Sequence, residues 1–131
     1  MMAACTDLLI VATPDVPSVM SATKTISLAN SLKVKPLGIV LNRVANKRYE
    51  VHDREVETIT EARALCKIPE DAVIPESIAM KTPAVIYRPN ARASMEMGRL
   101  HQDIWSSGER ARRAGIFSGL RDFLRSIFPW V

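Results

Sequence analysis

The chain has 131 residues, of which 47% are hydrophobic and 24% are charged, a balance typical of one folded domain and not of a disordered chain. The net charge is only +4, and residues 109–131 hold five arginines against two acidic residues, so +3 of it lies there. The remainder is close to neutral, which argues against a broad nucleic-acid-binding face. Cys5 and Cys66 show no metal-ligand spacing, and no apolar run approaches the ~20 residues that span a bilayer.

The N-terminal part has the pattern of a strand, a helix and a second strand. Asp7–Thr13 is a short apolar run and predicts a strand buried on both faces. Ser18 is expected to cap the helix that follows, whose apolar residues recur at helical spacing through Leu32. Pro36–Leu41 predicts the next buried strand. Two strands joined through a helix by short links form a βαβ unit with a parallel sheet.

Asn42 and Arg43 directly follow the second predicted strand. Ligands of open α/β sheets bind outside the carboxyl ends of the strands. An asparagine amide offers an acceptor and two donors, which suit the edge of a nucleobase. The alternative is that the pair only begins an ordinary loop, and this stretch alone leaves both interpretations open.

After a polar loop, the pattern predicts further elements that complete the α/β domain. These are a helix at Arg54–Leu65 capped by Asp53, a short strand at Cys66–Ile68, an edge strand at Ala84–Tyr87 and a helix at Ala91–Ser106.

Residues 109–131 have a different pattern, with large apolar residues on one helical stripe and a basic stretch before it. Flanking arginines and terminal aromatic residues predict a helix that lies in a membrane interface, with Arg121 and Arg125 at the lipid head groups. The alternatives are a helix packed on the core and a helix held in a groove of a partner protein. The residues predicted to contact the membrane are Ile116, Phe117, Leu120, Arg121, Phe123, Leu124, Arg125, Ile127, Phe128 and Trp130.

Four stretches, taken in order, resemble the C-terminal half of MinD/ParA-type P-loop ATPases, the family of the septum-site-determining proteins. They are DLLIVATPDVPSV (7–19), GIVLNR (38–43), LCKIPED (65–71) and PESIAMKTPAVIYRP (75–89). The resemblance implies an α/β fold: the parallel-sheet half of a doubly wound P-loop NTPase over residues 1–108. It also implies a basic linker and an amphipathic membrane-targeting helix over residues 109–131.

The resemblance assigns roles to individual residues. It implies that Asn42 contacts the adenine base of ATP and that Arg43 lines the same pocket. Pro69, Glu70 and Asp71 would form the other wall, although Cys66 replaces the family's glycine in this stretch. The implied activity is ATP-dependent association with an anionic membrane surface at the cytoplasmic face, in the placement of the cell-division site. Implied partners are MinC- or MinE-like regulators, with no specific nucleic acid.

The sequence departs from the family in its phosphate-binding part. No G-x-x-x-x-G-K-[ST] motif occurs, and the backbone N–H groups and lysine of that loop are what hold the phosphates. We therefore expect no catalysis by this chain alone. ATP with Mg²⁺ would need the missing N-terminal half, supplied in the same reading frame or as a separate chain. The implied partners therefore also include a second copy of this chain or a protein that supplies the P-loop half. Half of such a sheet also exposes a central strand edge, which predicts that the isolated chain is poorly soluble or only partly ordered.

Two alternative functions remain open at this stage. One is a non-catalytic, membrane-associated adaptor that keeps the half-fold and the amphipathic terminus. The other is a ParA-type partition protein that binds DNA, which the near-neutral body disfavours.

Overall fold

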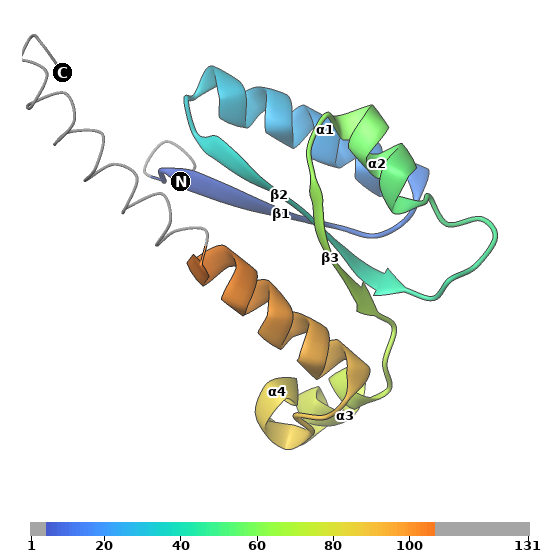
Figure 1. Cartoon of the computed structure of the whole chain (residues 1–131). Coiled ribbons are helices and arrows are strands. Elements are labelled where there is room, and N and C mark those ends of the chain that lie inside the picture. Colours follow the sequence, from blue (N-terminus) through green and yellow to red (C-terminus); the bar gives the residue numbers. More distant parts are fainter. Residues whose placement is uncertain (1–4, 107–131) are drawn as a thin grey trace, which may run out of the picture. The chain divides into compact units, whose positions relative to one another are not determined.

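The computed structural model describes residues 5–106 and contains a parallel sheet with helices (Figure 1). The chain divides into two units, Met1–Gly98 and Arg99–Val131, and the first of them holds the sheet. The predicted membrane-contacting residues, within 116–130, lie outside the described range.

The elements of the first unit follow an α/β order. They are β1 (Asp7–Ala12), α1 (Val16–Ser31), β2 (Lys35–Val44), α2 (Asp53–Thr60), β3 (Ala64–Pro69), α3 (Val73–Ala79) and α4 (Ala84–Tyr87). Residues 92–106 are helical. Both strand pairs are parallel, in the order β1-β2-β3, so the predicted α/β class and the parallel βαβ unit are confirmed.

The main core lies between the sheet and the helices α1 and α2, which cover the same face (Figure 1). The predicted apolar stripe of α1 is confirmed, because Val19, Ala22, Ile26 and Ala29 are all buried. The central strand β2 contributes Ile39, Val40 and Leu41, each at most 1% exposed. A strand buried on both faces is what the continuous apolar run predicted.

The start of α1 corrects the predicted cap. The N-cap is Asp15, whose Oδ1 accepts a hydrogen bond from the N–H of Ser18 at 2.9 Å. Pro17 is tolerated because the first turn needs no donor from it. The hydroxyl of Ser18 instead accepts from the N–H of Thr13 at 3.0 Å, so it ties the helix to the end of β1.

Two other predicted elements were wrong. The helix predicted to run to Leu65 ends at Thr60, because Glu61 adopts a left-handed conformation with φ 53°. Ala64 and Leu65 instead begin β3. The predicted edge strand at Ala84–Tyr87 is the short helix α4, which opens with N–H groups of Ile86 and Tyr87 donating to Pro83 O, each at 2.9 Å.

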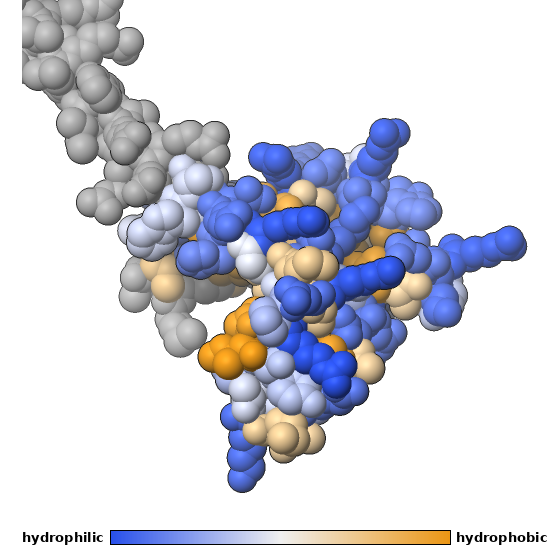
Figure 2. All heavy atoms as spheres, turned by 60° about the horizontal axis from the view of Figure 1, so that its bottom comes forward, coloured by the Kyte–Doolittle hydropathy of each residue, from blue (hydrophilic) through white to orange (hydrophobic). Residues whose placement is uncertain are grey.

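The exposed surface carries both apolar and hydrophilic side chains. On the face shown in Figure 2, small groups of apolar residues lie between hydrophilic side chains. Exposed apolar residues include Ile78 in α3 and Ile86 in α4, at 72% and 69%. Scattered apolar residues of this kind are normal on a folded domain and do not by themselves indicate a partner.

Candidate functional site at the strand ends

The carboxyl ends of β2 and β3 lie side by side. Val44 pairs with Pro69 across the two strands, and the N–H of Glu70 donates to Val44 O at 3.0 Å. This pairing brings the predicted residues Asn42 and Arg43 to the same edge of the sheet as Pro69 and Glu70, where ligands of open α/β sheets bind.

Asn42 and Arg43 form a local turn at this edge. Arg43 has a left-handed backbone with φ 60°, and its N–H donates to Oδ1 of Asn42 at 3.0 Å. The bond fixes the orientation of the Asn42 side chain and uses only its oxygen. Its amide N–H groups have no partner among residues 5–106, so they are available to an acceptor such as a ring nitrogen.

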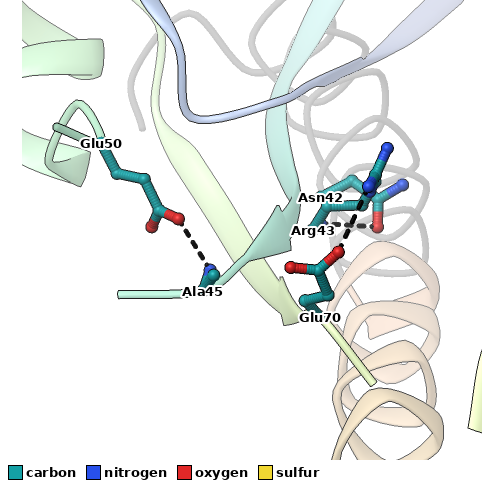
Figure 3. A network of polar contacts seen from close by, with 5 residues as sticks. All are labelled: Asn42, Arg43, Ala45, Glu50 and Glu70. Carbon is teal, nitrogen blue, oxygen red and sulfur yellow. Dashed lines mark hydrogen bonds and ion pairs between the residues drawn. The ribbon is translucent and has the colours of Figure 1, made fainter. Parts of the chain in front are cut away.

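An ion pair links the end of β2 to the residue that follows β3. The side chains of Arg43 and Glu70 point toward each other in Figure 3, and Nη2 of Arg43 lies 3.2 Å from Oε1 of Glu70. The two side chains are 69% and 55% exposed, so solvent screens the pair and its contribution to stability is at most about 1 kcal/mol. The pair therefore orients the strand-end side chains more than it stabilises the fold.

Glu50 holds the loop that follows β2, and sequence reasoning missed it. Its carboxylate accepts a hydrogen bond from the N–H of Ala45, drawn in Figure 3, and another from the N–H of Asn46, both at 2.9 Å. The loop thus closes on itself within a few residues of Asn42. Because no spacing rule links Glu50 to the strand end, only the folded loop reveals this contact.

Asp71 fixes the loop after β3 to the helix that begins at residue 92. Its carboxylate accepts from the N–H of Val73 at 3.0 Å and from the N–H of Ala93 at 3.3 Å. These bonds, with the nearby charge of Arg92, lower the pKa of Asp71 below its ordinary value. The side chain of Asp71 is therefore occupied with the backbone, and its predicted base contact stays a prediction.

A cavity of about 200 Å³ opens next to the strand ends. It is lined by Val44, Asn46, Lys67, Pro69, Arg92, Met95 and Glu96. Pro69 is the one lining residue that the sequence singled out. Ligand pockets for whole small molecules measure about 300–1,000 Å³, so this cavity fits a ring-sized group better than a nucleotide.

Lys67 in this cavity is already paired. Its Nζ lies 3.2 Å from Oδ2 of Asp53, and this bond is the main cause of the lowered pKa of that carboxyl. Arg92 is then the lining cation that has no ion pair among the described residues, apart from its long-range attraction to Asp71.

A bound Mg-nucleotide also has a metal ion and phosphates to hold. Within residues 5–106, no group of three or more His, Cys, Asp and Glu side chains could hold a metal ion. The full sequence contains no P-loop motif, whose backbone N–H groups and lysine would hold the triphosphate.

No described helix is long and apolar enough to cross a bilayer.

No family model matches the sequence. Two ATP-binding proteins of Methanocaldococcus jannaschii, MJ0547 and MJ0169, are 32% and 31% identical to it over 87 residues. The match takes in 66% of this chain, which spans only 33% of the length of either curated relative.

Solved structures of MinD proteins share the fold. The cell division ATPase MinD of Pyrococcus furiosus matches with a TM-score of 0.75 and 26% identity, over 80% of this chain and 44% of that one. MinD of Pyrococcus horikoshii, complexed with Mg-ADP, gives 0.72 and 22%, over 76% and 41%. A MinC:MinD complex of Aquifex aeolicus gives 0.70 and 20%, over 77% and 43%. The chain therefore has the α/β fold of MinD/ParA-type P-loop ATPases and matches less than half of the length of these relatives.

Proposed function

We propose that this chain supplies the base-recognising part of a MinD/ParA-type ATP-binding protein. One observation carries the proposal: the pairing of β2 with β3 brings Asn42 and Arg43 to the same sheet edge as Pro69 and Glu70. Two similar proteins support this proposal, because MJ0547 is described as an ATP-binding protein and the Pyrococcus horikoshii MinD is complexed with Mg-ADP.

In this proposal, the side-chain amide of Asn42 donates a hydrogen bond to the edge of the adenine ring. Its Oδ1 already accepts from the Arg43 N–H, which holds the amide N–H groups in one orientation for a ring nitrogen. Pro69 supplies a rigid apolar wall of the cavity, while Arg43 and Glu70, which do not line it, form an ion pair at the same strand ends. Asp71 contributes by holding the loop in place.

The phosphates and Mg²⁺ need groups that this sequence lacks. Hydrolysis in this proposal requires a P-loop half from outside the given sequence, in the same reading frame or as a separate chain, and the two halves together are called the assembled protein. The assembled protein would act at the cytoplasmic face of the membrane, through residues 116–130, in the placement of the division site. The MinC:MinD complex of Aquifex aeolicus supports a MinC-like regulator, and a MinE-like one is proposed by the same analogy.

A single substitution tests the base contact. Asn42→Asp keeps the acceptor for the Arg43 N–H but replaces the amide donors by a carboxylate oxygen. We expect it to weaken ATP binding by about tenfold or more, as measured by calorimetry on the assembled protein. Asn30→Ala is the matched control, because Asn30 is exposed on α1 away from the strand ends. Equal affinities for wild type and Asn42→Asp would contradict the base assignment.

A non-catalytic adaptor is the second candidate, and the absence of a P-loop motif from the sequence favours it. It predicts binding to anionic vesicles that is indifferent to ATP. Phe123→Asp should abolish that binding in a flotation assay, whereas Leu28→Asp, at an exposed apolar position of α1, should not. If added ATP strengthens vesicle binding of the assembled protein, the adaptor is ruled out.

A further inference from the structure

The loop that connects β2 to α2 (Figure 1) is fixed at its first residues. The N–H of Ala45 donates to Oε1 of Glu50 and the N–H of Asn46 donates to Oε2, both at 2.9 Å. Asn46 also has a left-handed backbone with φ 56°, so the chain turns sharply where the carboxylate holds it. Both oxygens of Glu50 are therefore occupied by the backbone of its own loop.

The last residues of the same loop are fixed as well. Val51 packs in the core and is 9% exposed, and its N–H donates to Pro14 O at 3.0 Å. The N–H of Glu50 donates to Lys47 O at 3.0 Å, which closes a tight turn. The loop is thus held on both sides of its tip, which we define as residues 47–49.

The tip presents three exposed side chains, those of Lys47, Arg48 and Tyr49. Tyr49 is 81% exposed, the highest value among the large hydrophobic residues of the described range. A tyrosine offers a large contact area and has few side-chain torsions to order on binding. Because the backbone of the loop is already fixed, binding at the tip would cost little further ordering.

The two cations of the tip have no intramolecular ion pair within residues 5–106. Glu50, the nearest acid in the sequence, uses both oxygens for backbone N–H groups, and Asp53 pairs with Lys67 at 3.2 Å. With Glu50 counted, residues 45–52 carry a net charge of +1. Lys47 and Arg48 are therefore available to a negatively charged group outside this fold.

The chemistry of the tip favours one class of anionic partner. Affinity for a nucleic acid grows with the number of phosphates neutralised, and the tip offers only two cations on a near-neutral body. Binding to a lipid surface grows with the apolar area inserted, and the tip has one tyrosine and no aliphatic side chain. Tyrosine and arginine, in contrast, are enriched where binding energy concentrates in protein interfaces.

We propose that the tip of this loop is a docking surface for an acidic segment of a partner protein. In this arrangement, the ring of Tyr49 packs against an apolar side chain of the segment, while Lys47 and Arg48 pair with its carboxylates. Glu50 is a positioning residue, since it fixes the loop backbone and does not itself contact the segment. The inference goes beyond the base site at Asn42 and requires no nucleotide.

The probe for this surface is a phage-displayed library of random short peptides, selected on the full chain without nucleotide. We expect the recovered peptides to be enriched in Asp and Glu beside an apolar residue. Arg48→Glu should weaken binding of a recovered peptide by about tenfold or more in fluorescence anisotropy, because an attraction becomes a repulsion. Lys24→Glu is the matched control, since Lys24 is an exposed cation of α1 that also forms no ion pair within residues 5–106. It should leave the affinity unchanged.

Two further substitutions separate a fixed contact from loose charge attraction. Tyr49→Ala should weaken binding by about tenfold or more, whereas Tyr49→Phe, which keeps the ring, should stay within about threefold of wild type. Glu50→Ala removes a negative charge, so charge attraction alone would tighten binding. We expect weaker binding, because the loop loses the carboxylate that holds its first residues.

Several results would overturn the proposal. These are recovery of no peptide or of peptides without acidic enrichment, equal affinities for wild type and Arg48→Glu, an equal loss with Lys24→Glu, and tighter binding by Glu50→Ala. Binding of anionic vesicles or single-stranded DNA that Arg48→Glu abolishes would also overturn it, since the tip would then serve a lipid or a nucleic acid. The side chains of Arg48 and Tyr49 are exposed, so their variants should keep the wild-type thermal midpoint. Because nucleotide is absent throughout, a failure of ATP binding would leave these results unaffected.

Discussion

Two regions of the same sheet, the carboxyl ends of β2 and β3 and the outer edge of β1, differ in how their polar and apolar groups are contacted. At the strand ends, polar groups are tied together by Glu50, Asp71 and the Arg43–Glu70 pair. At the edge of β1, no strand among residues 5–106 pairs with the outer side, and Val11 is 61% exposed. The strand ends hold their polar side chains in fixed positions, as a ligand site requires. The edge of β1 leaves an apolar side chain exposed to solvent, as a surface that binds a partner does. The following predictions test this difference, from the largest expected effect to the smallest.

Gly38→Ala should disturb both regions, because Gly38 lies in the strand β2 that they share. Its φ is +148°, and an added Cβ would lie 2.6 Å from Arg63 O and 2.7 Å from Cγ of Leu65. Strain and overpacking together should cost about 3–5 kcal/mol of the free energy of unfolding, measured by urea denaturation. Gly98→Ala is the matched control, since no atom lies within 4 Å of its added Cβ, and it should be neutral or slightly stabilising. Equal costs for the two substitutions would contradict the close packing of β2 on β3.

Ile10→Ala and Val11→Ala should separate the two faces of β1. Ile10 is 6% exposed and packs in the core, so its truncation should cost about 2–4 kcal/mol of unfolding free energy. Val11 is 61% exposed, and its truncation in the isolated chain should cost less than about 1 kcal/mol. Both values come from the same denaturation experiment. A large cost for Val11→Ala in a monomeric chain would mean that part of the chain already covers that face.

Asp71→Asn should loosen the strand-end region alone. Hydrogen bonds from the Val73 and Ala93 N–H groups, helped by the charges of Arg92 and Arg88, lower the pKa of Asp71 below its ordinary 3.8. Since the folded-state value is the lower one, the stabilisation is present above pH 3.8 and disappears as the pH falls through the folded value. The substitution should cost about 1 kcal/mol at neutral pH and nothing in strong acid.

The measurement for Asp71 is unfolding free energy against pH in wild type and variant. Asp103→Asn is a suitable control, because the structure gives the Asp103 carboxylate no hydrogen bond among residues 5–106. A difference between wild type and Asp71→Asn that stays constant down to the lowest pH would show that the carboxylate charge is not involved.

Arg43→Ala should have the smallest effect on stability, less than about 1 kcal/mol, because its ion pair with Glu70 is largely exposed. Added salt should reduce the wild-type stability by a similarly small amount and leave the variant unchanged. A loss of several kcal/mol would mean that the strand ends depend on this pair for folding and not only for orientation.

The strands and α1 could be predicted from sequence, because apolar runs and helical spacing indicate them directly. The end of α2 could not, since pairing of β3 with β2 takes Ala64 and Leu65 out of the helical pattern. The helix α4 was mistaken for a strand because Val85 and Ile86 favour strands, whereas its conformation depends on bonds to Pro83 and on the Ser94 hydroxyl donating to Ala84 O. Glu50 and Arg92 enter the site through loop closure and helix packing, which a linear pattern does not record.

The most direct test of the base site is the NMR signal of the Asn42 side-chain amide during titration with ATP and with adenosine. We expect this signal to shift with both ligands in the assembled protein, because both carry the adenine ring, while the Asn30 signal stays in place. Shifts confined to ATP, or an Asn42 signal that responds to neither ligand, would contradict a base contact at the ends of β2 and β3.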